Sequence, residues 1–451
     1  MNRFFSLFNV LTFAFTFLCS SLLAQSPDIE WQKCLGGSKE DRIYCIEQTK
    51  DGGFIAAGST LSVDGDLNSN KGIKGAWLVK LHSDGSIDWE KTYLSDSLGK
   101  IRNVRQTADG GYVAIGDKTI KVDANGNVLW VVGVKGFDIL QSKDSVYVAC
   151  GDTLTATDEI LVRKFDSAGN IFWNFIYDGG QATSIKETSD GYIFTGFYNY
   201  DITSYGVLGK LNVDGDEIYV KDEDAGGIND VALTRDGNYV FAGWNSTAAN
   251  IKLIDPTGSL IWQASDSLTG SILSSIRQTT NGYVTCGQGH LTSGSSDMVY
   301  VRNYDSAGNV IWKKLLGGSN NNIGNCIRQT TDGGFIIAGY TNSTDGDVKG
   351  NHGGYDGWIV KLKGSTGIKD ILQNSSIIQV YPTVTKSVVN ILLLDNKNAS
   401  MVLLNSLGQR VNAEHFSTPY NTIDLSNYSN GLYILQIYSN NNMQSYKIIK
   451  K

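Results

Sequence analysis

The segment QTTDGGFIIAGYT, residues 329–341, decides the fold because the chain contains several close copies of it. These copies are QTKDGGFIAAGST at 48–60, QTADGGYVAIGDK at 106–118 and TRDGNYVFAGW at 234–244. A phrase that returns with a period of roughly 20–50 residues is the signature of solenoids, propellers and related arrays. The chain is therefore expected to repeat one small structural unit.

Alignment of the copies gives three columns, each with seven members. The first column is the aromatic residue after the turn: Phe54, Tyr112, Tyr147, Tyr192, Tyr239, Tyr283 and Phe335. The second is the glycine that closes the run: Gly58, Gly116, Gly151, Gly196, Gly243, Gly287 and Gly339. The third is an upstream β-branched residue: Ile46, Val104, Ile139, Ile185, Val231, Ile276 and Ile327. Seven copies are therefore expected.

Each copy is predicted to form four short strands. The dipeptide Asp-Gly between the first two apolar runs favours a tight hairpin, because its turn needs positive φ angles that glycine adopts freely. A third run of the WLVKL type, as at 77–81, leads to a second turn such as DSAGN at 166–170. The fourth run ends on an aromatic residue, Trp in five copies and Tyr219 in another.

The two ends of the array are complementary. The last third strand, WIVKL at 358–362, has no fourth strand after it, whereas DIEWQKCLGG at 28–37 matches NVIWKKLLGG at 309–318. A closed ring explains this offset, since an open array would leave exposed strand edges at both ends. The sequence thus predicts an all-β protein with a seven-bladed β-propeller at 27–363, closed by its N-terminal strand.

The longest loops of this propeller, 59–75 and 340–357, belong to the two blades on either side of the closure. Both lie on the face that carries the loops of variable length, and binding residues concentrate on such loops. Any ligand is expected on this face near the closure. The loops also carry Asp64, Asp66, Asn68, Asp345 and Asp347, whose closely spaced oxygens suit calcium. The alternative is a set of polar, glycine-rich turns.

The N-terminus is expected to be a secretory signal peptide at 1–24, with a basic Arg3, an apolar run and a small Ala24. A lipoprotein anchor at Cys19 is the alternative, although Leu18 before it is large. No later run is long and apolar enough to span a bilayer. The mature chain keeps five cysteines, an odd number that leaves at least one unpaired, and Cys150 and Cys286 are expected to be small buried residues.

The pattern changes after a polar linker at 364–376. The segment 377–451 contains VYP, SVVNI, LNSLGQRV, IDLSNYSNGLYILQI and a final KIIKK. It resembles the C-terminal sorting domain of type IX secretion cargo in the Bacteroidetes, with Thr383 and Val384 where that family usually has Asn and Pro. The matching motif residues are Tyr381, Pro382, Gly408, Gly431, Tyr433, Lys450 and Lys451.

Alternating apolar runs broken by Asn, Ser and Gly clusters predict a small immunoglobulin-like β-sandwich in this segment. The resemblance implies export through the periplasm by the type IX machinery, and a secreted or cell-surface protein. The propeller repeats also resemble those of secreted proteins in the same bacteria. An ordinary immunoglobulin-like module is the alternative for 377–451.

The sequence contains no motif that carries catalysis. None of HExxH, GxSxG or a paired Cys/His spacing occurs among its four histidines. The formal net charge of −7 argues against nucleic acid as a partner. The expected function is that of a monomeric, non-enzymatic scaffold binding a glycan or a protein, with calcium as the one possible cofactor. A polysaccharide hydrolase or lyase on the same scaffold is the alternative.

Overall fold

The computed structural model describes residues 26–67, 75–93, 99–153, 158–177, 179–200, 203–245, 248–265, 271–290, 296–364, 378–381, 384–393, 399–418, 420–439 and 442–451. Every regular element in these ranges is a β-strand. Within the described ranges, no helix has the length and apolarity that a membrane crossing requires. The chain divides into two compact units, one ending at Ser365 and one beginning at Thr366.

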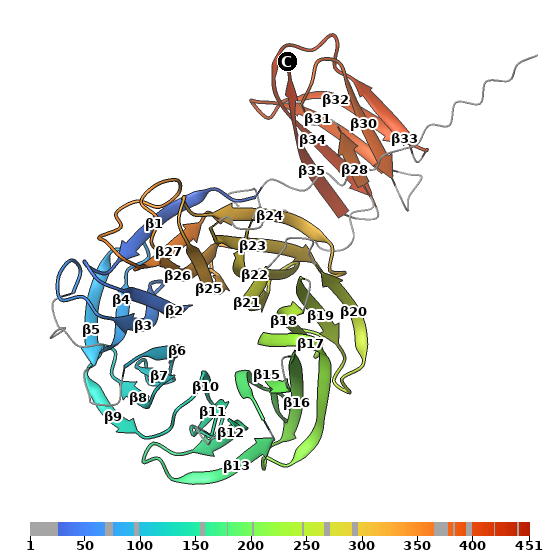
Figure 1. Cartoon of the computed structure of the whole chain (residues 1–451). Helices are drawn as coiled ribbons and strands as arrows, with labels where there is room; N and C mark the ends of the chain where they lie inside the picture. Colours follow the sequence, from blue (N-terminus) through green and yellow to red (C-terminus); the bar gives the residue numbers. More distant parts are fainter. Residues whose placement is uncertain are drawn as a thin grey trace, which may run out of the picture. The chain divides into compact units, whose positions relative to one another are not determined.

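The first unit is a ring of seven four-stranded antiparallel sheets, which confirms the predicted propeller (Figure 1). Blade 1 is β2 (Asp41–Gln48), β3 (Phe54–Thr60), β4 (Gly75–Leu81) and β5 (Ile87–Tyr93). Blade 2 is β6 (Ile101–Gln106), β7 (Tyr112–Gly116), β8 (Thr119–Val122) and β9 (Val128–Val132). Blade 3 is β10 (Asp138–Gln141), β11 (Tyr147–Asp152), β12 (Ile160–Phe165) and β13 (Ile171–Tyr177).

Blades 4 and 5 share one long strand. Blade 4 is β14 (Gln181–Glu187), β15 (Gly191–Tyr200), β16 (Thr203–Asn212) and the first part of β17 (Glu217–Leu233). The second part of β17 begins blade 5, which continues with β18 (Tyr239–Asn245), β19 (Ala249–Ile254) and β20 (Leu260–Ser265). Blade 6 is β21 (Ile272–Gln278), β22 (Gly282–Gly289), β23 (Met298–Asp305) and β24 (Val310–Leu316).

Blade 7 closes the ring with the N-terminal strand. It consists of β25 (Asn322–Gln329), β26 (Phe335–Thr341), β27 (Asp356–Leu362) and β1 (Ile29–Leu35). Strand β1 pairs antiparallel with β27, from Ile29 opposite Leu362 to Leu35 opposite Gly357. The unmatched third strand of the sequence therefore has its partner at the other end of the propeller, as the offset predicted.

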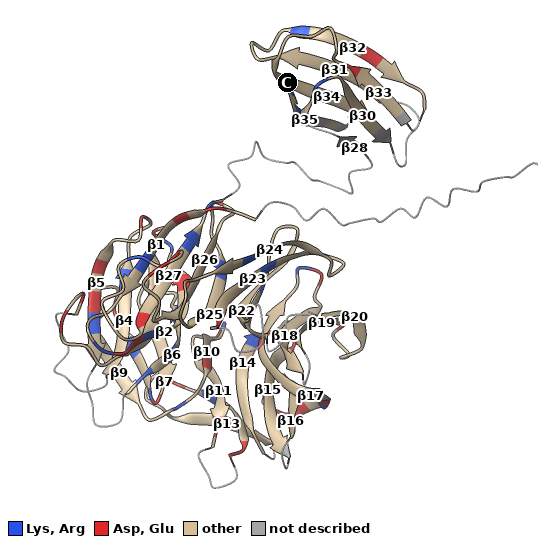
Figure 2. Cartoon of the chain, turned by 45° about the horizontal axis from the view of Figure 1, so that its top comes forward, with Lys and Arg blue, Asp and Glu red and all other residues tan. Residues whose placement is uncertain are grey.

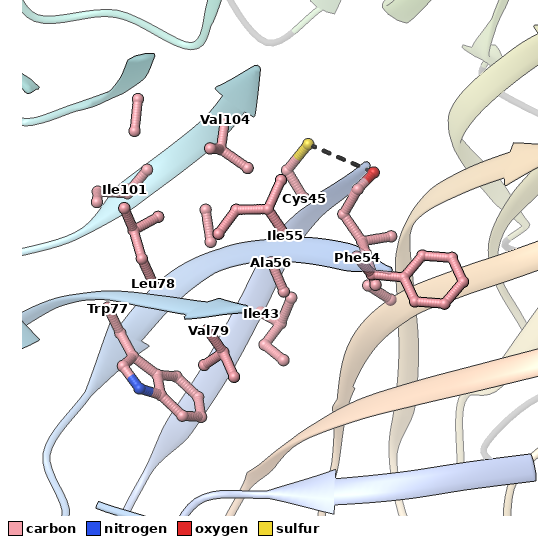
Figure 3. Packing of buried hydrophobic residues seen from close by; sticks show 14 of the residues in the cluster. Ile43, Cys45, Phe54, Ile55, Ala56, Trp77, Leu78, Val79, Ile101 and Val104 are labelled. Carbon is pink, nitrogen blue, oxygen red and sulfur yellow. Dashed lines mark hydrogen bonds between the residues drawn. The ribbon is translucent and has the colours of Figure 1, made fainter. Parts of the chain in front are cut away.

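The aromatic column of the repeat packs one blade on the next. Trp89 of blade 1 contacts Tyr112 of blade 2 with ring centroids 6.1 Å apart. Trp130–Tyr147, Trp173–Tyr192, Trp262–Tyr283 and Trp312–Phe335 repeat this contact at the following joints. Apolar residues of facing sheets fill the space between blades, and Figure 3 shows Ile43, Val79 and Ile101 in the cluster that spans blades 7, 1 and 2.

The polar letters of the repeat are also contacts. The glutamine of a QT pair accepts a turn N–H of the preceding blade in three blades, as Gln106 Oε1 does from Lys50 N at 2.9 Å. The lysine of the third strand is buried and reaches the aspartate of the Asp-Gly turn, as Lys80 Nζ does with Asp51 at 2.9 Å. The same pair recurs as Lys121–Asp109, Lys164–Asp144, Lys210–Asp190 and Lys361–Asp332. The phrase recurs because each blade must make the same contacts.

The second unit is a two-sheet β domain. One sheet has the order β28 (Ile378–Tyr381), β30 (Val388–Leu393), β33 (Tyr420–Asp424). The other has the order β29 (Val384–Thr385), β35 (Asn442–Lys450), β34 (Gly431–Ser439), β31 (Ala399–Asn405), β32 (Arg410–Phe416). Alternate apolar residues from both sheets, among them Ile391, Leu403 and Leu435, form its core.

Candidate binding site in the central channel

The innermost strands of the blades line a channel along the axis of the ring. A cavity of about 310 Å³ lies in it. Its lining includes two complete sets of seven residues, one from each blade. The inner ring, directly before the β-branched column, is Cys45, Asn103, Asp138, Ser184, Asp230, Ser275 and Cys326. The mouth ring, one residue earlier, is Tyr44, Arg102, Phe137, Thr183, Asn229, Ser274 and Asn325.

A β-bulge explains how two consecutive residues of one strand both face the channel. In blade 1 the register with β3 shifts between Ile43 and Cys45, so Tyr44 is the extra residue. Equivalent shifts occur in blades 2, 4, 5, 6 and 7. A bulge interrupts the strict alternation of a strand and redirects a side chain. The sequence columns alone gave no sign of these bulges, and the channel residues were therefore not predicted.

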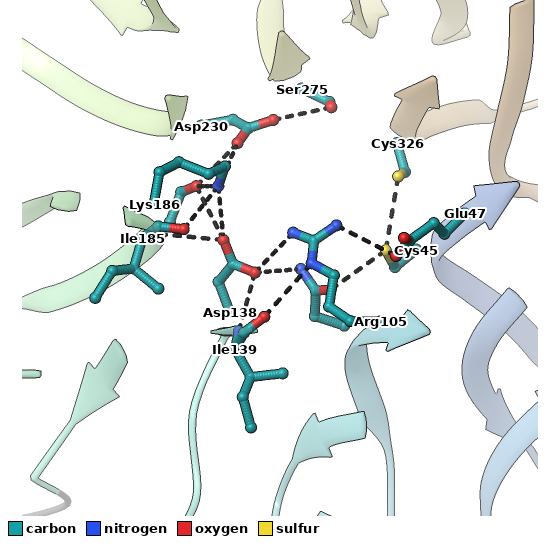
Figure 4. Close-up of polar contacts among 12 residues, drawn as sticks. Cys45, Glu47, Arg105, Asp138, Ile139, Ile185, Lys186, Asp230, Ser275 and Cys326 are labelled. Carbon is teal, nitrogen blue, oxygen red and sulfur yellow. Dashed lines mark hydrogen bonds and ion pairs between the residues drawn. The ribbon is translucent and has the colours of Figure 1, made fainter. Parts of the chain in front are cut away.

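Asp138 is the hub of a buried charge network at the inner ring (Figure 4). Its Oδ1 accepts from Asn103 (2.8 Å) and Arg105 (3.0 Å), and its Oδ2 accepts from Lys186 Nζ (2.9 Å). Burial alone would raise the pKa of Asp138, but Lys186 and Arg105 hold it well below its usual range. Asp138 is therefore a fixed anion that joins blades 2, 3 and 4.

Asp230 repeats this arrangement two blades further on. Its Oδ2 accepts from Ser275 Oγ (2.9 Å) and pairs with Arg277, and its Oδ1 faces Ser184 Oγ at 2.9 Å. Burial opposes ionisation, yet Arg277 and Lys186 lower the pKa of Asp230. Both aspartates also accept a backbone N–H from the next blade, as Asp138 does from Ile185 and Asp230 from Ile276, at 3.1 Å each. These carboxylates connect blades through backbone and side chains.

The blade 1 to blade 7 side of the inner ring carries sulfur instead of carboxylate. The Sγ atoms of Cys45 and Cys326 are 3.8 Å apart, and Arg328 Nη2 lies 3.8 Å from the Cys45 sulfur. Burial raises the pKa of the neighbouring Glu47, while Arg105 and Arg328 oppose that rise. Within the described ranges no ion pair joins Arg328 to a carboxylate, whereas Arg105 pairs with Glu47 and Asp138, and Arg277 with Asp230.

Aromatic and polar side chains share the mouth ring. The guanidinium of Arg102 lies 4.1 Å from the ring centre of Phe137, and its Nε has no hydrogen-bond partner among described residues. Phe197 and Gln181 of blade 4, together with Arg277 and Arg328, complete the lining of the cavity. The arrangement offers aromatic faces, a cation, and the hydroxyl and amide groups of four further mouth residues to a molecule in the channel.

The predicted face near the closure carries another cation–aromatic cluster. Arg42 lies between Tyr340 and Tyr355, with its guanidinium 4.9 and 5.0 Å from their ring centres. The two tyrosine rings contact each other edge to face at 5.4 Å. This cluster joins the start of blade 1 to the loop of blade 7.

Figure 2 shows acidic and basic residues interspersed over the propeller strands rather than gathered on one basic face.

The calcium candidates occupy two copies of one loop structure. Asp64 Oδ1 accepts the N–H of Ser38 at 2.8 Å, and Asp66 Oδ2 accepts that of Gly36 at 3.1 Å. We call this contact the aspartate latch, since it fixes the loop after β3 to the connection between β1 and β2. The hydrogen bond from Ser38 lowers the pKa of Asp64.

The second aspartate latch holds the loop after β26 in the same way. Asp345 Oδ1 accepts the N–H of Ser319 at 2.7 Å, and Asp347 Oδ2 accepts that of Gly317 at 3.1 Å. Asn68 lies outside the described residues. Within the described ranges, no three His, Cys, Asp or Glu side chains gather in a way that could hold a metal. The latches give these aspartates a structural role, and calcium binding stays a prediction.

The motif residues of the second unit have local structural roles. Gly408 has φ +77° in the β31–β32 turn, where Asn405 Oδ1 accepts from Leu407 N and Gln409 N at 3.0 Å each. Tyr433 is buried, and its hydroxyl donates to Ser429 O at 2.8 Å.

Gly431, with φ +155°, opens β34, and Lys450 lies at the end of β35. Lys451 N donates to Thr385 O at 2.9 Å, so the last residue is tied to β29. Tyr381 pairs with Asn390 through its backbone, and Pro382 lies outside the described residues.

Comparison with known families identifies the kind of domain that the second unit is. Residues 379–451 match the family model described as "Secretion system C-terminal sorting domain". The chain therefore carries a sorting domain at its C-terminus, which implies export and a secreted or cell-surface protein. No curated protein matches the chain.

Solved propellers resemble the chain only distantly. The propeller of Dos1 aligns at a TM-score of 0.46 and 10% identity, over 92% of this chain and 95% of that one. Sqt1 from Chaetomium thermophilum gives 0.45 and 12%, over 76% and 100%. PorZ, described as an essential bacterial surface component of the type IX secretion system of Porphyromonas gingivalis, gives 0.27 and 11%, over 92% and 75%. The assignment of the fold thus rests on the strand pairing itself.

Proposed function

We propose that this protein is a cargo of the type IX secretion system and that its propeller is a non-catalytic module that binds a glycan in the mouth of the central channel. The sorting domain at 379–451 supports the export half of this proposal. An N-terminal signal at 1–24 would take the chain across the inner membrane, and the sorting domain would direct passage across the outer membrane.

The mouth ring carries the binding half of the proposal. A cavity of about 310 Å³ falls at the lower end of the range for small-ligand sites, and it suits one or two sugar rings. Tyr44 and Phe137 provide faces for the apolar side of a sugar, while Asn229 and Asn325 provide amides for its hydroxyl groups. Arg102 adds a donor that has spare hydrogen-bonding capacity.

Hydrolysis is the second candidate, because Asp138 and Asp230 both line the cavity. A glycosidase needs two carboxyl groups, one of which has a raised pKa and can donate a proton. The pKa of each aspartate is instead lowered, and cationic, hydroxyl and backbone donors surround both carboxylates. This geometry favours a fixed structural anion over a proton donor, and it supports binding over hydrolysis.

Binding can be tested with the purified full-length protein on a glycan array. The variants Phe137→Ala and Tyr44→Ala should bind the glycans that the unsubstituted protein retains with an affinity at least tenfold lower. Phe172→Ala is the matched control, because Phe172 is 59% exposed on the outer strand β13 and should leave binding unchanged. Equal loss in all three variants, or retention of peptides but no glycans, would contradict the proposal. Release of reducing sugar from a bound glycan would support the hydrolase instead.

Export can be tested separately in the native host. Deletion of residues 377–451 should leave the propeller in the periplasm, and fusion of this segment to a foreign exported protein should bring that protein to the cell surface or medium. A truncated protein that still reaches the surface would disprove the sorting role and leave the binding proposal intact.

A further inference from the structure

Cys45 and Cys326 are the two described cysteines whose sulfur atoms are in contact, with Sγ atoms 3.8 Å apart. Cys45 lies on β2 of blade 1 and Cys326 on β25 of blade 7. These blades are at opposite ends of the propeller sequence and meet where the ring closes. The two thiols therefore become neighbours only when the ring is complete.

Cys326 occupies the inner-ring position at which blades 3 and 5 have the carboxylates of Asp138 and Asp230. Its Sγ accepts the N–H of Ile46 of the next blade at 3.4 Å. Asp138 and Asp230 accept the equivalent N–H groups of Ile185 and Ile276. A thiolate at Cys326 would repeat at the closure the anionic contact that the aspartates make at two other joints.

The surroundings of the pair also separate the acidities of the two thiols. The hydrogen bond with Cys45, then Arg328 and Arg277, lowers the pKa of Cys326 to about 6 against the opposing effect of burial. The hydrogen bond with Cys326, together with burial, raises the pKa of Cys45 well above its usual value. A thiolate is the form of cysteine that reacts with an oxidant, and a neighbouring thiol can then resolve the oxidised sulfur to a disulfide.

The burial of the two sulfur atoms limits which oxidants can reach them. Both cysteines line the channel cavity, yet their exposed fractions are only 2% and 3%. A protein oxidant cannot reach sulfur atoms so deeply placed, whereas a molecule of the size of hydrogen peroxide can enter the cavity.

We propose that Cys45 and Cys326 are a modification site, where a peroxide converts the two thiols to a disulfide that covalently links blade 1 to blade 7. In the first step the Cys326 thiolate attacks one peroxide oxygen and the O–O bond breaks. Cys326 becomes a sulfenic acid, and the leaving hydroxide takes a proton to form water.

In the second step Cys45 loses its proton, and its sulfur attacks the sulfur of that sulfenic acid. The S–O bond breaks, the S–S bond forms, and the departing hydroxide takes the proton as a second water. Overall, two thiols and one peroxide give one disulfide and two waters.

The test is peroxide treatment of the full-length folded protein, followed by non-reducing peptide mapping. A disulfide-linked pair of peptides containing Cys45 and Cys326 should appear, and dithiothreitol should remove it. The oxidised protein should melt roughly 5–10 °C above the reduced one, because the link restricts the unfolded chain over a very long loop. Cys45→Ser and Cys326→Ser should lose this rise, while Cys286→Ser, a buried cysteine of blade 6, should keep it.

The mapping of the unsubstituted protein decides the question even where a variant fails to fold. Peroxide that leaves both thiols free, or that oxidises Cys326 without joining it to Cys45, would overturn the proposal. So would a melting temperature that is equal in the oxidised and reduced protein despite complete formation of the linked peptide, since the link would then fail to hold the closure.

Discussion

The indole of Trp31 packs edge to face on the ring of Phe54, with centroids 5.9 Å apart. Trp31 lies on β1, the strand that completes blade 7, and Phe54 lies on β3 of blade 1. The contact is the same one that Trp89 makes with Tyr112 between blades 1 and 2. The closure therefore uses the ordinary joint between blades, although its two halves come from opposite ends of the propeller.

Replacement of this indole should measure how firmly the ring is closed. Trp31→Ala removes a large side chain packed against the core and should lower the free energy of unfolding by about 3 kcal/mol. Trp89→Ala at the next joint is the matched control, because both residues are partly buried against the same cluster. Similar losses in urea denaturation are expected. A small loss for Trp31 beside a large loss for Trp89 would mean that β1 does not seal the ring.

The stability of the propeller should depend on the charge of Asp138. Asp138→Ala leaves Arg105 and Lys186 without their shared carboxylate and should cost about 3–5 kcal/mol in the free energy of unfolding. Asp166→Ala in the same blade is the control, since Asp166 bonds mainly to its own turn through Ala168 N and Asn170 N. Because the pKa of Asp138 is lowered on folding, this stability should be present above about pH 4 and decline below it.

Equal effects of the two substitutions would show that the network does not hold the inner ring together. If the unsubstituted protein cleaves a glycan and a stable Asp138→Ala variant does not, that result would instead support the hydrolase.

The aspartate latches and the calcium hypothesis predict different outcomes. If the latches act alone, Asp64→Ala and Asp345→Ala should lower the melting temperature equally with calcium and with a chelator, because only backbone hydrogen bonds are lost. If calcium binds, a site filled at a hundred times its dissociation constant should stabilise the unsubstituted protein by about 2.7 kcal/mol. Calorimetry in calcium and in chelator distinguishes the two.

Much of this fold was predictable because the repeat encodes contacts within each blade and between neighbouring blades. The types of residue at Gln106, Asp51 and Lys80 recur in the sequence because each bonds a neighbouring turn or strand. Trp31 could be assigned to blade 7 because the last third strand, at 358–362, has no fourth strand after it in the sequence. The channel was not predictable in the same way. Its residues differ from blade to blade, from Cys45 to Asp138 to Ser275, and in blades such as those of Cys45 and Ser275 their orientation depends on a bulge that no repeated residue marks.

The role of the Asp-rich loops was also beyond the sequence. As a cluster of oxygens in the sequence, Asp64 and Asp345 suit a metal ion, and nothing in the sequence shows that each accepts the N–H of a serine on another strand connection. The repeated LGGS segments at 35–38 and 316–319 were the available signal, because each precedes its latch at the same separation.

Asp356, at the start of β27, should make stability depend on pH. The residue is fully buried; burial raises its pKa from 3.8 to about 6, although the backbone N–H and the ring of His352 lower it in part and Asp41 adds to the rise. One of its oxygens, Oδ1, has no hydrogen-bond partner among described residues. A raised carboxyl pKa contributes stability that is present below about pH 4 and lost as the pH rises through 6.

The isosteric variant Asp356→Asn removes this titration and keeps an acceptor for the N–H of His352. Its free energy of unfolding should therefore rise relative to the unsubstituted protein between pH 4 and pH 7, by at most roughly 3 kcal/mol for a change of two pKa units. His352→Gln removes the ring donor that opposes the rise, so it should shift the midpoint of the pH dependence upward. Urea denaturation across this range measures both effects, and parallel curves for all three proteins would show that Asp356 does not titrate there.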